Sequence, residues 1–78
     1  MTDYSIINVD ISSKVLTQLP DDIDKYTNLQ KLKCAFNQLT SLDNLPLNLQ
    51  ILDCSDNLLT SLDYLPLNLK YYIVITIN

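Results

Sequence analysis

The stretch LQKLKCAFNQLTSLDNLPLN, residues 29–48, is followed directly by LQILDCSDNLLTSLDYLPLN, residues 49–68. These are two copies of one 20-residue unit, and they differ at only six positions. Self-similarity at a fixed period of this length is typical of repeat folds, in which each unit buries its apolar side against its neighbours. The stretch therefore predicts a stack of short, similar units along the chain.

The same spacing of apolar residues continues on both sides of the two copies. The positions that fit are Ile6, Val9, Ile11, Leu16 and Leu19 upstream, and Leu69, Tyr72 and Val74 downstream. A chain of 78 residues is long enough for one domain only. We therefore expect a single domain, 1–78, made of repeats at approximately 6–28, 29–48 and 49–68 and a partial repeat at 69–78.

Each unit contains a short alternating stretch that predicts a β-strand. Leu32, Lys33 and Cys34 alternate between apolar and polar, which is the period of a strand with one buried face. Strands this short need neighbours, and stacking the units places them side by side in a parallel sheet. Leu32 and its counterpart Leu52 are expected to point into the core.

The segments between the strands carry the prolines. The residue before a proline is restricted to extended geometry, so extended or single-turn structure is expected after Pro46 and Pro66. Between Pro20 and Tyr26 a short helix is expected, because proline suits the first turn and two aspartates suit its positive end. The chain has no glycine, so its turns are expected to use Asn, Asp, Ser and Pro.

The pattern L-x-x-L-x-[LC]-x-x-N-x-L-x-x-L resembles the signature of leucine-rich repeats. The match covers roughly residues 6–77, and the Leu-Pro-Leu-Asn-Leu segments at 45–49 and 65–69 are similar to short repeats of bacterial effectors and of giant DNA viruses. The first unit resembles the longer repeat type, because LPDDIDKYTNL at 19–29 has three extra residues.

The resemblance implies an α/β solenoid of about three and a half repeats. A short parallel β-sheet is expected on the concave side, with a mostly irregular convex side and little helix. The resemblance also implies that Asn37 and Asn57 form an internal ladder, bonding backbone groups that the turns leave unpaired. The alternative is that asparagine merely tolerates the turn conformation at these positions.

The composition argues against catalysis and against a cofactor or metal site. The chain has no His, Arg, Glu or Trp, so Ser/His and Cys/His nucleophilic pairs are excluded within it. Asp53 and Asp56 are expected in an exposed strand and turn with no recognisable pocket. Cys34 and Cys54 occupy equivalent inward positions and are expected to pack as small apolar residues, since two thiols do not complete a zinc site. We therefore expect a non-catalytic protein with no cofactor and no metal.

Charge and targeting signals narrow the partners and the compartment. The net charge is −4, which argues against nucleic acid and against an anionic membrane surface. The sequence shows no basic start followed by an apolar run, and no stretch of membrane-spanning length. An intracellular, cytoplasmic location is expected, or the cytoplasm of a host cell if the chain comes from a virus or an effector.

The differences between the two copies suggest where a partner protein binds. They are Lys31/Ile51, Lys33/Asp53, Ala35/Ser55, Phe36/Asp56, Gln38/Leu58 and Asn44/Tyr64. The first four are expected to point away from the core, as on a scaffold that presents a variable concave face. The candidate partner-binding residues are Asp10, Lys31, Lys33, Phe36, Ile51, Asp53, Asp56, Tyr71 and Ile73. The alternative is that exposed positions drift because nothing constrains them.

The last stretch of the chain suggests a second role. Residues 69–77, LKYYIVITI, are strongly β-prone, and no polar capping repeat follows them in this sequence. The last strand is therefore expected to have an open edge. The alternative function is a structural or self-associating fragment that forms a homo-oligomer through this C-terminal strand.

Overall fold

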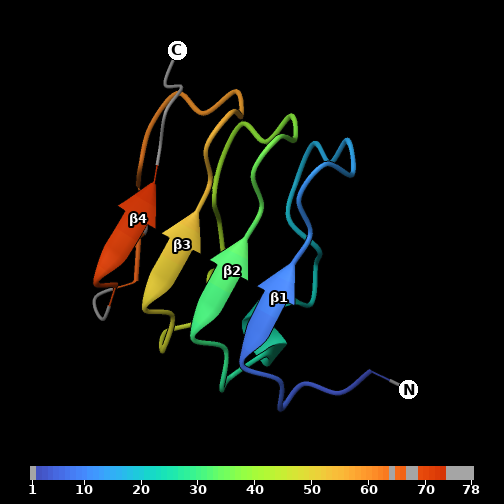
Figure 1. Ribbon diagram of the computed structural model, residues 1–78, viewed down its shortest axis with the longest axis vertical. Coiled ribbons are helices and arrows are strands. Elements are labelled where there is room, and N and C mark those ends of the chain that lie inside the picture. The colour runs from blue at the N-terminus through green and yellow to red at the C-terminus, as the bar shows by residue number, and fades with distance from the viewer. Residues whose placement is uncertain (1, 64, 67–68, 74–78) are drawn as a thin grey trace.

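Four short parallel strands form a sheet in the order in which they occur in the chain (Figure 1). The computed structural model describes residues 2–63, 65–66 and 69–73, with the backbone alone described for 71–73. The strands are β1 (Asn8–Asp10), β2 (Lys31–Lys33), β3 (Ile51–Asp53) and β4 (Tyr71–Ile73). The predicted parallel sheet is therefore confirmed.

The period of the sequence sets the register of the sheet. Leu32 pairs with Leu52, and Leu52 pairs with Tyr72, so each step across the sheet equals the 20-residue repeat. Val9 pairs with Leu32, across the longer first unit. Leu32 and Leu52 are 0% and 1% exposed, as predicted for the inward positions.

The connecting segments contain almost no helix. The element η1 (Ile23–Lys25) is a single 3-10 turn and is the one helical element of the described residues (Figure 1). It confirms the short helix expected between Pro20 and Tyr26. After Pro46 the chain makes a turn closed by a backbone bond of 3.3 Å from Leu49 N to Pro46 O, and Leu69 N bonds Pro66 O at 3.2 Å.

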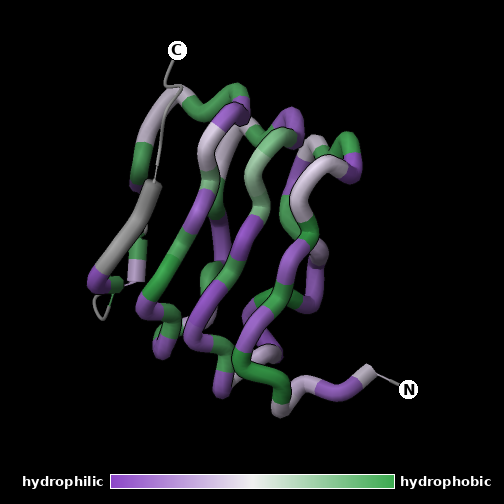
Figure 2. Tube along the Cα trace, viewed as in Figure 1, coloured by the Kyte–Doolittle hydropathy of each residue, from purple (hydrophilic) through white to green (hydrophobic). Residues whose placement is uncertain are grey.

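The core lies between the sheet and these connecting segments. Figure 2 shows apolar positions recurring at matching places along successive turns of the chain. The buried cluster consists of Leu19, Ile23, Leu29, Leu32, Cys34, Leu39, Leu42, Leu45, Leu49, Leu52, Cys54 and Leu59. Because equivalent positions of both copies fill the cluster, burial of apolar area holds neighbouring units together.

The two cysteines are part of this core. Cys34 and Cys54 are both 0% exposed and are not joined in a disulfide, which confirms the prediction that they pack as apolar residues. Burial raises the pKa of the Cys34 thiol to about 12 and that of the Cys54 thiol to about 11. Both side chains are therefore neutral at physiological pH.

Asn37 connects the first two units through its side-chain amide. Its Oδ1 accepts hydrogen bonds from the backbone N–H groups of Lys14 and Leu16, both at 3.0 Å. Its Nδ2 donates to the carbonyl oxygens of Ile11 at 3.0 Å and Cys34 at 3.1 Å. One buried side chain thus satisfies backbone groups on two adjacent turns of the chain.

Asn57 repeats this arrangement one unit later. Its Nδ2 donates to the carbonyl oxygens of Cys34 at 3.0 Å and Cys54 at 3.2 Å, and its Oδ1 accepts from the N–H of Leu39 at 3.0 Å. The residue is only 2% exposed. The expected asparagine ladder is confirmed, and its role exceeds mere tolerance of the turn.

Equivalent turn positions adopt the left-handed conformation without glycine. Ser13, Phe36 and Asp56 each lie five residues after the start of a strand, with φ values of 58°, 55° and 56°. Val15 and Asn44 also have positive φ, at 57° and 63°. The expectation that turns use only Asn, Asp, Ser and Pro is therefore wrong at Phe36 and Val15, because the repeat geometry overrides their local preference.

A second expectation also needs correction. Ala35 and Ser55 were expected to point away from the core, yet they are only 4% and 6% exposed. The strands end at Lys33 and Asp53, so the strict alternation of a strand no longer applies two residues later. These two positions belong to the buried turn and not to the variable surface.

Candidate functional site

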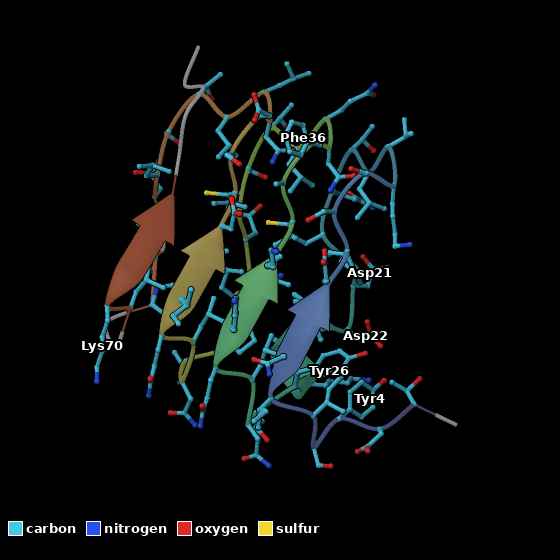
Figure 3. The ribbon with its side chains drawn as sticks, viewed as in Figure 1. Tyr4, Asp21, Asp22, Tyr26, Phe36 and Lys70 are labelled. Atoms are coloured by element: carbon cyan, nitrogen blue, oxygen red, sulfur yellow. The ribbon has the colours of Figure 1, made fainter. Side chains whose placement is uncertain are left out.

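The exposed face of the sheet brings together six residues in two rows. One row runs across Asn8, Lys31 and Ile51, and the other across Asp10, Lys33 and Asp53. The strand backbone of β4 extends both rows, but the side chains of Tyr71 and Ile73 lie outside the described residues. Figure 3 shows side chains of β2 and β3 standing out from this face.

A shallow depression lies on this face between β1 and β2. It has a volume of about 270 Å³ and is lined by Asn8, Val9, Asp10, Lys31 and Lys33. Its walls therefore carry one carboxylate, two ammonium groups and one amide. Such a lining suits hydrogen bonding and ion pairing with a polar ligand more than burial of a large apolar one.

The carboxylates on this face are bonded within their own turns. Asp10 Oδ1 accepts from the N–H of Ser12 at 3.0 Å. Asp53 Oδ1 accepts from the N–H of Ser55 at 3.2 Å and from its hydroxyl at 2.9 Å. Hydrogen bonds from Ser12, with Lys33 as a smaller electrostatic cause, lower the pKa of the Asp10 carboxyl below its usual 3.8. Both aspartates thus have a structural role in turning the chain out of its strand.

The lysines of the same face differ from the aspartates in this respect. Lys31 and Lys33 lie between β1 and β3, with Asp10 and Asp53 on either side of Lys33. Lys33 attracts the Asp10 carboxylate electrostatically, but no salt bridge joins either lysine to a carboxylate of the described residues. Both side chains are partly buried, so their aliphatic stems rest on the sheet while the charges reach solvent.

Phe36 and Asp56 lie apart from the face. They occupy the turns after β2 and β3, and Figure 3 places Phe36 beyond the end of β2, far from Lys70 at the opposite edge of the sheet. Phe36 is 62% exposed, and Asp56 is partly buried. Of the nine predicted site residues, five therefore lie on the sheet face and two lie in the turns after β2 and β3. The side chains of the other two, Tyr71 and Ile73, lie outside the described residues.

A second polar surface escaped the sequence reading. A depression of about 410 Å³ lies where the strands begin, and it is lined by Ile7, Asn28, Gln30, Asn48, Gln50 and Lys70. Gln30 and Gln50 are identical in the two copies, and Asn48 is matched by Asn28 twenty residues earlier, so the comparison of differences could not reveal them. The sequence does indicate this surface in another way, because its polar residues recur every 20 residues.

The N-terminal segment is attached to η1 by an aromatic cluster. The hydroxyl of Tyr4 donates to Asp22 Oδ2 at 2.9 Å, and the rings of Tyr4 and Tyr26 meet edge to face with centroids 5.0 Å apart (Figure 3). Lys25 Nζ lies 6.0 Å from the centroid of the Tyr4 ring. The hydrogen bond to Asp22 raises the pKa of Tyr4. Asp22 therefore fixes the chain terminus and does not cap η1.

The same described part of the chain offers neither a metal-binding cluster nor a membrane-spanning helix. Within it, no three His, Cys, Asp or Glu side chains lie close enough to hold a metal ion. No helix there has the length and apolar character needed to cross a membrane. Comparison of the chain with protein-family models, with curated proteins and with solved structures returned no match.

Proposed function

We propose that the chain is a leucine-rich repeat solenoid that acts as a non-catalytic protein-interaction module. In this proposal the exposed sheet face is the concave surface, and it binds another protein inside the cell. The proposal rests on a comparison of the two 20-residue copies, which shows where residues are kept and where they are replaced. The buried leucines, the cysteines and the ladder asparagines are the same in both copies, whereas Lys31/Ile51 and Lys33/Asp53 differ on the exposed face. Ala35/Ser55 is the buried pair that also differs.

The shape of the described chain supports binding over chemistry. The exposed face is broad and shallow, and its groups are charged, amide and apolar side chains from adjacent strands. Protein interfaces of this type depend on a few anchors surrounded by polar contacts. Ile51 lies beside Lys31 and is 36% exposed, and we take it as an apolar anchor on this face. Tyr71 and Ile73 are proposed as further anchors.

The proposal is tested by partner capture with matched variants. The immobilised full chain is incubated with an extract of its source cells, in parallel with Lys33→Asp/Ile51→Asp and with the control Leu58→Asp. Leu58 is exposed and apolar but lies outside the strands. We expect a protein retained by the wild type and by the control and lost by the face variant. Equal retention by all three chains would place the binding surface elsewhere.

Self-association is the second candidate function. It is favoured by the position of β4 at one edge of the sheet, where a strand can pair with another chain. Residues 74–77, which the sequence reading assigned to the same strand, lie outside the described residues. Sedimentation equilibrium over a concentration series separates the two functions. A monomer at high micromolar concentration excludes pairing through this edge at that level.

A further inference from the structure

The sheet face carries two carboxylates and two ammonium groups, and the two carboxylates are hydrogen-bonded to other described residues. Asp10 and Asp53 accept hydrogen bonds from the serines that follow them, so their carboxylates are directed into their own turns. No salt bridge joins Lys31 or Lys33 to a described residue, although Lys33 attracts the Asp10 carboxylate electrostatically from the next strand. A partner that covers this face must therefore offer hydrogen-bond acceptors to the two ammonium groups.

The two lysines present their charges at a defined spacing. They are the first and last residues of β2 and lie on the same face of that strand. Residues two apart along a strand are separated by roughly 6.6 Å. An extended segment with acidic residues at alternate positions has the same spacing, so its carboxylates fall opposite both ammonium groups.

The surroundings of the lysines add a second element of recognition. The depression between β1 and β2 lies on one side of them, and Asn8 on its wall offers both a donor and an acceptor. Ile51 lies on the other side, directly across from Lys31. An acidic segment that lies along β2 would therefore bring one of its own apolar residues against Ile51 and one of its own polar residues against Asn8.

From these contacts we infer that the sheet face binds an extended acidic segment of a partner protein, with two carboxylates at alternate positions that pair with Lys31 and Lys33. The inference rests on the proposed function, because it names the chemistry of the partner of that same surface. Nucleic acid is a poorer candidate for the same lysines. The chain has a net charge of −4 and no arginine, so its overall field repels a long polyanion.

The inference is tested by selecting short random-sequence peptides from a display library against the full chain. Bound peptides are then mapped by amide chemical shift changes in ¹H–¹⁵N spectra. We expect selected sequences enriched in Asp or Glu at alternate positions, with shifts concentrated in β2 and β3. A single-stranded oligonucleotide of matched charge serves as the competing probe and is expected to bind more weakly than the peptides.

Charge reversal supplies the quantitative part of the test. Lys31→Glu/Lys33→Glu is expected to weaken the selected peptides by roughly ten-fold or more, since two exposed ion pairs become repulsive. The control Lys14→Glu/Lys70→Glu makes the same change in net charge outside β2 and is expected to change affinity by less than about two-fold. If reversal perturbs the circular dichroism spectrum, Lys31→Met/Lys33→Met keeps most of the length of the apolar stems and removes the charges, and it is also expected to weaken the peptides.

The outcomes separate this inference from the function on which it rests. Peptides that bind the sheet face without acidic enrichment, equal weakening by both double variants, or tighter binding of the oligonucleotide would overturn the acidic partner and leave a binding face. Failure of every selected peptide to shift the signals of β2 and β3 would overturn both proposals.

Discussion

At the scale of single residues, the asparagine ladder is the feature on which each turn depends most. Asn57 donates to carbonyl groups of two units and accepts from the N–H of Leu39 while almost fully buried. A shorter side chain would leave these backbone groups without partners in a region closed to water. Buried groups stranded in this way cost about 1–3 kcal/mol.

The first prediction concerns the loss of the hydrogen bonds of Asn57. Asn57→Ala is expected to lower the free energy of unfolding by about 1–3 kcal/mol, measured by urea denaturation. Asn57→Asp keeps an acceptor for Leu39 but loses both N–H donors, so it is also expected to destabilise the fold. Gln38→Ala, at an exposed turn position, is the control and is expected to stay within about 0.5 kcal/mol of the wild type. A cost at Asn57 no larger than at Gln38 would contradict the ladder.

The second residue-scale prediction concerns the left-handed turn at Phe36. Its φ of 55° is unfavourable for a bulky side chain, and the ring is 62% exposed, so little burial offsets the strain. Phe36→Asn is expected to raise the free energy of unfolding by up to about 1 kcal/mol, because asparagine tolerates this conformation. Phe36→Val should lower it, because β-branched residues do so poorly there. If the urea midpoint of Phe36→Val equals or exceeds that of Phe36→Asn, this explanation is refuted.

At the scale of elements, the strands and the turns were predictable to different degrees. The alternation at Leu32 to Cys34 predicted β2 and its inward leucine, because a strand with one buried face has a period of two. The pairing partner followed from the repeat period alone. The burial of Ala35 and Ser55 could not be predicted in the same way, because the chain leaves the strand just before them and its direction there depends on the hydrogen bonds of the neighbouring unit.

The site was also predicted in part. The two rows on the sheet face follow from register and alternation, so Lys33 between two aspartates was foreseeable. The separation of Phe36 from that face depends on the path of the turn. The attachment of Tyr4 to Asp22 could not be foreseen either, because it joins residues 18 apart in sequence with no periodic signal between them.

The prediction at the element scale uses the thiols that follow β2 and β3. Burial raises the pKa of Cys54 to about 11 and that of Cys34 to about 12, above the usual 9.0. Thiolate is the reactive form, so alkylation by iodoacetamide at pH 8 is expected to proceed only through unfolding. Denatured chain in urea should react at the rate of an ordinary thiol, and the ratio of the two rates is the measurement.

The sign of the pH dependence follows from the same shifts. A raised folded pKa means that the neutral thiols contribute stability that is fully present below about pH 9 and is lost progressively as the pH rises towards 11 to 12. Alkylation of the native chain at the denatured rate would show instead that one of these positions is open to solvent.

At the scale of the whole molecule, the first three units are held together in the same way at both of their junctions. Equivalent leucines fill the core, Asn37 and Asn57 bond adjacent turns, and backbone bonds join the strands, so each of these units depends on its neighbours. The longest Cα dimension is 33 Å and the shortest 15 Å, which gives a thin body with a broad sheet face. Such a body offers a large surface for its size, which favours recognition of an extended partner.

The most direct test of this account is a map of nuclear Overhauser contacts between strands in a uniformly labelled sample. We expect contacts that link Val9 to Leu32 and Leu32 to Leu52 in a parallel pattern, and slow exchange of the Lys31 amide proton, which is bonded to the Ile7 carbonyl oxygen. Contacts in an antiparallel pattern, or a register shifted by one residue, would contradict it. A one-residue shift would turn Lys31 and Lys33 into the core and Leu32 to solvent, and would remove the proposed binding face.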